Sequence, residues 1–175
     1  MADTTTRMWG IGGRTITVSV TRTIAAAGDY AAEDVVSDST SAGTAMTFSI
    51  GKNKGAGGYI TKAGVLCSVT ALTPRFTLYL FNNTPTSNLN DNAANAAPVT
   101  ADRASYIGKI DFPATEDLGG NSEVLITPST IGNLPLAFNC DEDDASLYGI
   151  LVTRDAITGE SANMTIVVTL TSEIQ

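Results

Sequence analysis

The chain is 175 residues long, carries a formal net charge of −8 and contains no histidine. Its length predicts one domain that can bury a core without disulfides or metal ions. A chain with this negative net charge lacks the basic surface that contacts nucleic-acid phosphates, which argues against nucleic-acid binding. The lack of histidine removes the commonest general base and the commonest metal ligand, and no motif in the chain calls for a metal ion or another cofactor.

Charge and polarity are distributed unevenly along the chain. Residues 1–100 have a net charge of +1, whereas residues 101–175 have a net charge of −9. Charged residues make up 16% of the chain, below the average of about 25%. Thr, Ser, Ala, Asn and Gly fill the difference, and they suit sheet faces and turns better than long helices. We therefore expect a β protein whose acidic half faces solvent or a basic partner.

Residues 1–14 are expected to form a short extended arm before a single domain at 15–175. The arm lacks the apolar segment of a secretory signal, and no stretch approaches the ~20 apolar residues of a membrane span. It holds the only tryptophan, which either packs back onto the domain or anchors on a partner, since Trp and Arg are enriched at interface hot spots. The candidate contact residues are Arg7, Met8, Trp9, Ile11 and Arg14.

The first half of the domain contains four segments with strand-like patterning. They are residues 15–22, 30–36, 45–50 and 59–72, the second of them a short edge strand. In the fourth, the inward positions change parity near Gly64, which predicts a β-bulge or bend there. The glycine-rich residues 51–58 lack the spacing of a phosphate-binding loop and precede a strand, so they predict a turn or hairpin.

Two clear strands, at 75–81 and 106–112, flank a long loop at 82–97. In the second strand, Tyr106, Ile110 and Phe112 are expected to share one face. The loop is longer than an ordinary hairpin connection, and such loops are often functional or disordered. Three interpretations stay open: it packs on a neighbouring subunit, it is simply exposed, or it binds sugar.

Four more strands are expected at 123–127, 134–139, 147–154 and 162–171. The acidic run Asp141–Asp144 lies between two of them. Adjacent acids lack the alternate spacing and the glycine of a calcium loop, so the run predicts a solvated acidic turn. Cys67 lies in a strand pattern and is expected to be a buried free thiol, although spacing alone does not exclude a disulfide with Cys140.

Eight to ten short strands separated by polar turns, with no predicted helix, indicate an all-β fold. The expected architecture is an antiparallel β-sandwich or jelly roll. Isolated sandwiches leave sheet edges that assembly can cover, so we expect a homotrimer.

Several segments of the chain resemble small virion proteins of tailed bacteriophages, of the head decoration or cement type. These segments are residues 28–40, 75–94, 101–114, 134–138 and 147–153. The resemblance implies a β-rich, often trimeric protein on the outer capsid surface, made in the host cytoplasm. It implies the major capsid protein as partner and stabilisation of contacts between shell subunits as function. No binding residue of the family maps onto this chain, so the arm residues rest on composition alone.

Two other interpretations remain open: a phage fibre, spike or tail component, and a carbohydrate-binding β-sandwich. Aromatic residues make up only 6% of the chain, which disfavours sugar binding. Tyr59, Tyr79, Phe81 and Tyr106 are the available stacking residues. We do not expect an enzyme, because a glycosidase needs two carboxylates across a cleft and the acids here cluster in turns.

Overall fold

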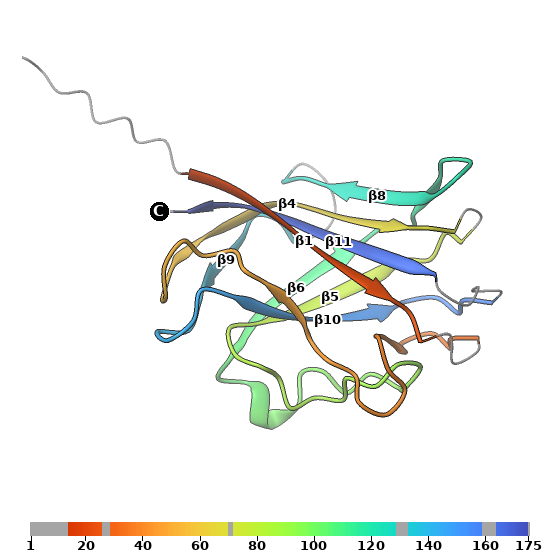
Figure 1. Ribbon diagram of the computed structural model, residues 1–175, viewed down its shortest axis with the longest axis horizontal. Helices are drawn as coiled ribbons and strands as arrows, with labels where there is room; N and C mark the ends of the chain where they lie inside the picture. The colour runs from red at the N-terminus through yellow and green to blue at the C-terminus, as the bar shows by residue number, and fades with distance from the viewer. Residues whose placement is uncertain (1–13, 26–28, 70–71, 129–132, 159–163, 175) are drawn as a thin grey trace, which may run out of the picture.

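The computed structural model describes residues 14–25, 29–69, 72–128, 133–158 and 164–174. They form two antiparallel sheets that pack face to face as a sandwich, with essentially no helix (Figure 1). The predicted all-β sandwich is therefore confirmed. Most of the expected arm lies outside the described residues.

The first sheet contains six strands. Five of them follow in the order β1 (Arg14–Thr23), β11 (Thr165–Ile174), β4 (Gly57–Cys67), β8 (Ser122–Ile126) and β7 (Glu116–Asp117). The sixth, β9 (Leu136–Asn139), pairs with the N-terminal half of β4, and β8 pairs with its C-terminal half. The short strand β7 lies in a region where the sequence predicts only turns.

The second sheet contains five strands. Four follow in the order β2 (Val35–Val36), β10 (Leu147–Thr153), β5 (Phe76–Phe81) and β6 (Tyr106–Phe112). The fifth, β3 (Met46–Phe48), pairs with β10 on the same side as β2. A single turn of 3-10 helix at Thr100–Asp102 precedes β6.

The core lies between the sheets and is made of alternating side chains from both. On β11, the inward residues Ile166, Val168 and Leu170 are fully buried, as the alternation predicts. They face residues such as Leu78 and Ile110 of the other sheet within one continuous cluster. Burying one such side chain stabilises the fold by about 1.5–3 kcal/mol, so the two sheets hold together without disulfides.

A β-bulge in β4 changes which positions face the core. The pairing with β11 skips Thr61, so that Ile60 points inward before the bulge and Val65 points inward after it. The change of face is confirmed, but its predicted place at Gly64 is wrong. Gly64 instead leaves room for a neighbouring strand, because a Cβ atom there would lie 3.1 Å from Cδ1 of Leu125.

A second bulge, in β6, corrects the predicted face of Tyr106. The pairing with β5 skips Ile107. Ile110 and Phe112 face the core, whereas Tyr106 lies on the outer side of the sheet, with its ring centroid 5.4 Å from that of Phe81. Simple alternation assumes a strand without a bulge, so it assigns Tyr106, the one residue of β6 before the bulge, to the wrong face.

The segment between β5 and β6, residues 82–105, folds back over the outer face of the second sheet. Its backbone runs beside β2, where the Val35 N–H donates to the Ala93 carbonyl and the Asn92 N–H donates to the Val35 carbonyl, both at 2.9 Å. Beneath it lies a second apolar cluster that includes Phe81, Ala97 and residues of β2 and β10. The loop is therefore not simply exposed. Contact with a neighbouring subunit and sugar binding both remain predictions for its outer side.

Two buried carboxylates hold this loop in place. Asp102 accepts four hydrogen bonds of 2.6–2.9 Å from the backbone N–H and hydroxyl groups of Thr86 and Ser87. Burial alone would raise the pKa of Asp102, but these hydrogen bonds outweigh it and hold the pKa below its ordinary value. Asp91 accepts from the Tyr30 hydroxyl at 2.8 Å and the Ser37 N–H at 2.7 Å, and its burial raises its pKa.

The glycine-rich segment connects β3 in one sheet to β4 in the other, so it is a crossing turn and the hairpin alternative is wrong. At its tip, Gly55 has a φ of 68° and its N–H donates to the carbonyls of Asp141 and Asp144. Glycine adopts this left-handed backbone at low cost. The crossing turn and the acidic turn therefore support each other through the backbone.

Replacing Asp102 by Ala should lower the free energy of unfolding by about 3 kcal/mol, because buried N–H groups of the loop lose a charged acceptor. Urea unfolding measures this loss, and hydrogen exchange should show it concentrated in residues 82–105. Glu142→Ala, which removes an exposed acid, is the matched control. Equal stability of the two variants would contradict the anchoring role of Asp102.

Candidate interaction site

Strand β1 presents an open edge of the first sheet. All ten of its residues pair with β11 on one side. On the other side, no backbone partner for β1 is found in the described part of the chain. An edge of this length carries a row of unpaired N–H and C=O groups, which is a template for a strand of another chain.

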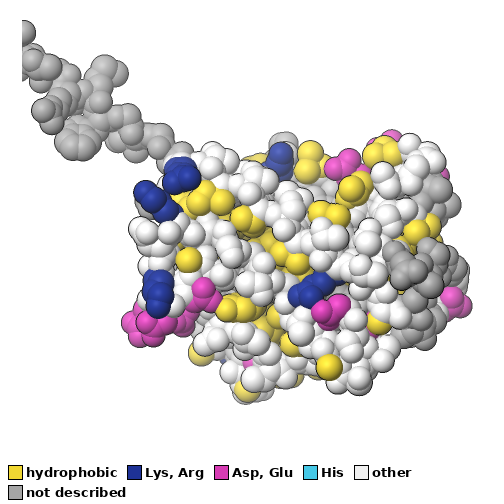
Figure 2. All heavy atoms as spheres, viewed as in Figure 1, with side chains coloured by type: hydrophobic (Ala, Val, Ile, Leu, Met, Phe, Trp, Pro, Cys, Tyr) yellow, Lys and Arg dark blue, Asp and Glu magenta, His cyan; other side chains and the backbone are white. Residues whose placement is uncertain are grey.

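The side chains of β1 alternate between hydroxyl and aliphatic groups. Thr17 and Ser19 point outward and hydrogen-bond across the strand pair to Thr171 at 3.0 Å and Thr169 at 2.8 Å. The inward residues Ile16, Val18 and Val20 are only half-buried, because no strand covers them beyond the edge. Figure 2 shows a diagonal line of hydrophobic side chains along the course that β1 takes in Figure 1.

Three of the other described edges are partly covered, shortened or charged. Residues 92–95 cover β2, and β7 is two residues long and both are acidic. At β6, the Asn133 amide donates to the carbonyl of Lys109 at 3.5 Å and to the carboxylate of Asp111 at 3.0 Å. Shortening, charging and covering are the usual protections of an edge strand. At ten residues, β1 is the longest of the described edge strands, and among the described residues no backbone segment covers it.

The structure places one of the five candidate contact residues. Arg14 is the first residue of β1 and is exposed at the end of the open edge. Arg7, Met8, Trp9 and Ile11 lie outside the described residues. The sequence predicts a strand at β1 but does not show that it is an edge strand. Alternation indicates which side chains share a face of a strand, but it does not indicate which strands lie beside it.

A groove of about 510 Å³ opens where β4 and β9 meet the start of β6. Its lining includes Tyr59, Asn82, Ser105, Tyr106 and Asn139. The side chain of Tyr59 is 42% exposed. Two of the four expected stacking residues, Tyr59 and Tyr106, therefore meet at one groove together with amide and hydroxyl groups, whereas Phe81 is buried beneath the loop.

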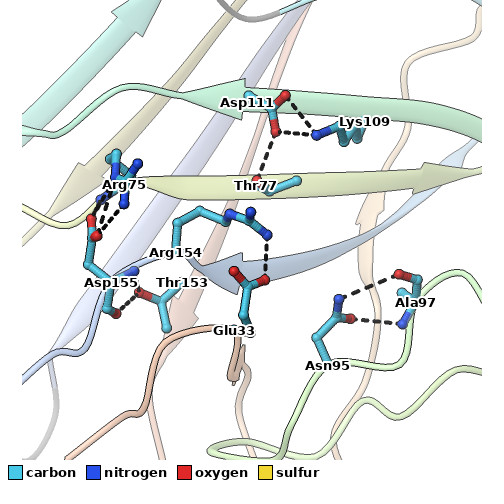
Figure 3. Close-up of polar contacts among 10 residues, drawn as sticks. All are labelled: Glu33, Arg75, Thr77, Asn95, Ala97, Lys109, Asp111, Thr153, Arg154 and Asp155. Carbon is cyan, nitrogen blue, oxygen red and sulfur yellow. Dashed lines mark hydrogen bonds and ion pairs between the residues drawn. The ribbon is translucent and has the colours of Figure 1, made fainter.

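The outer face of the second sheet carries three ion pairs around a smaller groove of about 390 Å³ (Figure 3). They join Arg75 to Asp155, Lys109 to Asp111, and Arg154 to Glu33. Hydrogen bonds from the Arg75 side chain and backbone lower the pKa of Asp155 to about 2. Because each of the three cations already faces an acid, this face offers little net attraction for an anionic ligand.

In the acidic turn at Asp141–Asp144, the side chain of Asp144 stabilises the turn and the start of the strand that follows. The Asp144 carboxylate accepts hydrogen bonds from the Tyr148 hydroxyl at 2.5 Å, the Ala145 N–H at 2.6 Å and the Ser146 N–H at 3.1 Å. These hydrogen bonds lower the pKa of Asp144, and the bond from Tyr148 has the largest effect. Within the described residues, no group of three or more acidic or Cys side chains is placed to hold a metal ion.

Both cysteines are buried and free. Burial raises the pKa of each thiol to about 11, so both stay protonated at neutral pH. Cys67 is a core residue of β4, as the sequence predicts, and the alternative disulfide to Cys140 is not formed. The two thiols act as small apolar side chains.

Comparison with models of known protein families finds no match to this chain, and a search of curated proteins finds none either. In the described part of the chain, no helix has the length and hydropathy needed to cross a bilayer. The surface geometry and the resemblance of the sequence segments therefore carry the functional proposal.

Replacing Asp155 by Asn should reduce the sensitivity of the fold to acid. The pKa of Asp155 is depressed in the folded state, so its contribution to stability is present above about pH 4 and is lost as the pH falls towards 2. The free energy of unfolding should differ between wild type and D155N at pH 5, and the difference should shrink by pH 2. Glu142→Gln is the control, and a difference that does not vary with pH would contradict the assignment.

Proposed function

We propose that the protein is a capsid decoration protein of a tailed bacteriophage, which binds the outer surface of the head and stabilises contacts between major capsid protein subunits. The capsid role rests on the resemblance of the sequence segments, and the open edge of β1 is the structural observation that supports an assembled state. A stable monomer would be expected to protect an edge of ten residues. An unprotected edge suits a protein whose working state is an assembly.

The distribution of charge supports an assembly through this edge. Strand β1 contains two arginines and no acid, although the whole chain has a net charge of −8. A contact made by β1 therefore does not bring acidic groups together. The acidic turn and β7 remain available to face solvent, which keeps a densely covered particle soluble.

The mechanism that we propose is mechanical. Cement proteins stabilise a shell by burying area across neighbouring subunits, and a specific interface of standard size buries about 1,600 Å² in total. The sandwich supplies a rigid body, and the arm expected at residues 1–14 continues directly from the start of β1. We propose that this arm contacts the shell, while the edge of β1 joins decoration subunits to one another.

The number of copies per particle tests this function. Quantitative mass spectrometry of purified phage should find hundreds of copies, in a simple ratio to the major capsid protein. Heads that lack the protein should burst at a lower temperature than complete heads, because the shell loses buried contact area. A few to a few tens of copies would indicate tail, fibre or portal hardware instead, and absence from the particle would refute both assignments.

The groove between β4, β9 and β6 favours a second candidate function, the binding of a carbohydrate. An exposed tyrosine ring beside amide and hydroxyl groups matches the amphipathic surface of a sugar, whose ring face is apolar and whose edge is polar.

Replacing Tyr59 by Ala should weaken any saccharide binding at least about tenfold, or about 1.4 kcal/mol, through loss of the stacking surface. A panel of immobilised neutral oligosaccharides would first identify a ligand for the wild-type protein, and calorimetry would then compare the variants. Leu125→Ala, which removes another exposed apolar side chain far from the groove lining, is the control. Equal loss in both variants, or no wild-type binding to any sugar, would reject this candidate.

A further inference from the structure

We infer that a second copy of this chain completes the open edge, through antiparallel pairing of β1 with β1 of its partner. The partner strand then joins the two first sheets into one continuous sheet. This inference rests on the proposed function for the role of the dimer, whereas the pairing itself rests on β1 alone.

The length of the edge favours a second copy as its occupant. A strand of ten residues is best completed by a strand of similar length, since every second residue of an uncovered stretch leaves its N–H and C=O groups without a partner. The other described edge strands are shorter, at two to seven residues. A strand edge that matches β1 in length is therefore supplied by β1 of a second copy of the chain.

The side chains of β1 are complementary to themselves in an antiparallel register centred on Val18. In this register Val18 lies opposite the same residue of the partner, Ile16 lies opposite Val20, and Thr17 lies opposite Ser19. Half-buried aliphatic groups thus meet aliphatic groups on the core side, and hydroxyls meet hydroxyls on the outer side. β-Branched and Thr–Ser pairs of this kind stabilise neighbouring strands.

The charges at the ends of β1 are compatible with this pairing. The register brings Arg14 opposite Arg22 of the partner, and like charges in direct opposition would destabilise the pair. However, the guanidinium of Arg22 is already bound to the carboxylate of Asp38 at 2.6 Å and to the carbonyl of Ala45 at 2.6 Å. Arg14 therefore meets a neutralised ion pair.

Symmetry limits the assembly to two copies. When the same edge pairs with itself, the contact is isologous and closes as a dimer. The expectation of a homotrimer came from the general need to cover sheet edges, and the longest described edge, β1, can be covered by its own copy. We therefore propose a two-fold dimer as the unit of assembly in place of the trimer.

Sedimentation equilibrium of the full-length protein tests the dimer. The expected mass is twice the 18.1 kDa of the chain at micromolar concentration. Val18→Lys should raise the dissociation constant at least about 100-fold, because two ammonium groups would meet at the centre of the interface. A single lysine can still reach solvent from the half-buried position in a monomer. Leu125→Lys, on the exposed outer face of the same sheet, is the control and should leave the mass unchanged.

A cysteine scan tests the register without relying on the folding of Val18→Lys. Val18→Cys should form a disulfide-linked dimer on mild oxidation, since residue 18 lies opposite itself and the two native thiols are buried. Thr21→Cys lies opposite Thr15 of the partner, so it should crosslink far less. Equal crosslinking of both variants would overturn the register.

Different results separate this inference from the proposed function. A monomeric or trimeric mass, or an unchanged dimer with Val18→Lys, would overturn the pairing of β1 even if the protein is abundant on phage heads. A dimer in solution that is absent from purified heads would leave the pairing intact and overturn the capsid role.

Discussion

Backbone hydrogen bonding at the strand edges is the constraint on which the rest of this structure depends. A sandwich buries its side chains well, but it leaves rows of N–H and C=O groups along the margins of both sheets. Three unrelated devices reduce this exposure elsewhere: a loop backbone beside β2, an asparagine amide at β6 and a short acidic strand at β7. The margin at β1 has none of these, so the same constraint that shapes the fold also points to where the fold is incomplete.

The long loop shows how a sheet acquires two buried faces. Residues 82–105 form an extra layer over the second sheet, and Asp91 and Asp102 hold that layer through hydrogen bonds to hydroxyl and N–H groups. A buried carboxylate is costly unless it is hydrogen-bonded, and these two are. The loop therefore belongs to the structural body of the protein, and the second sheet is closed to partners over the area that it covers.

Alternation in the sequence predicted the strands and the sandwich because side-chain periodicity follows directly from strand geometry. It located β5 and β10 to within one residue and placed β11 three residues too early, and it gave the buried faces that Leu78, Val168 and Leu170 occupy. Alternation did not locate the bulges at Thr61 and Ile107. A bulge is defined by the pairing of two strands, so the sequence of one strand alone gives little indication of it. Alternation missed the open edge for the same reason: the neighbours of β1 are decided by the arrangement of the whole sheet.

The turn between β7 and β8 has a consequence for engineering. At Gly119 and Gly120, a Cβ atom would meet no other atom within 4 Å, and Gly119 has a φ of 85°. The turn lies at the opposite side of the first sheet from β1, with β11, β4 and β8 between them. A foreign peptide inserted there would be tethered to a rigid hairpin without touching the edge that assembles. If the protein coats phage heads, this turn offers a position for displaying antigens or enzymes in a dense and regular array.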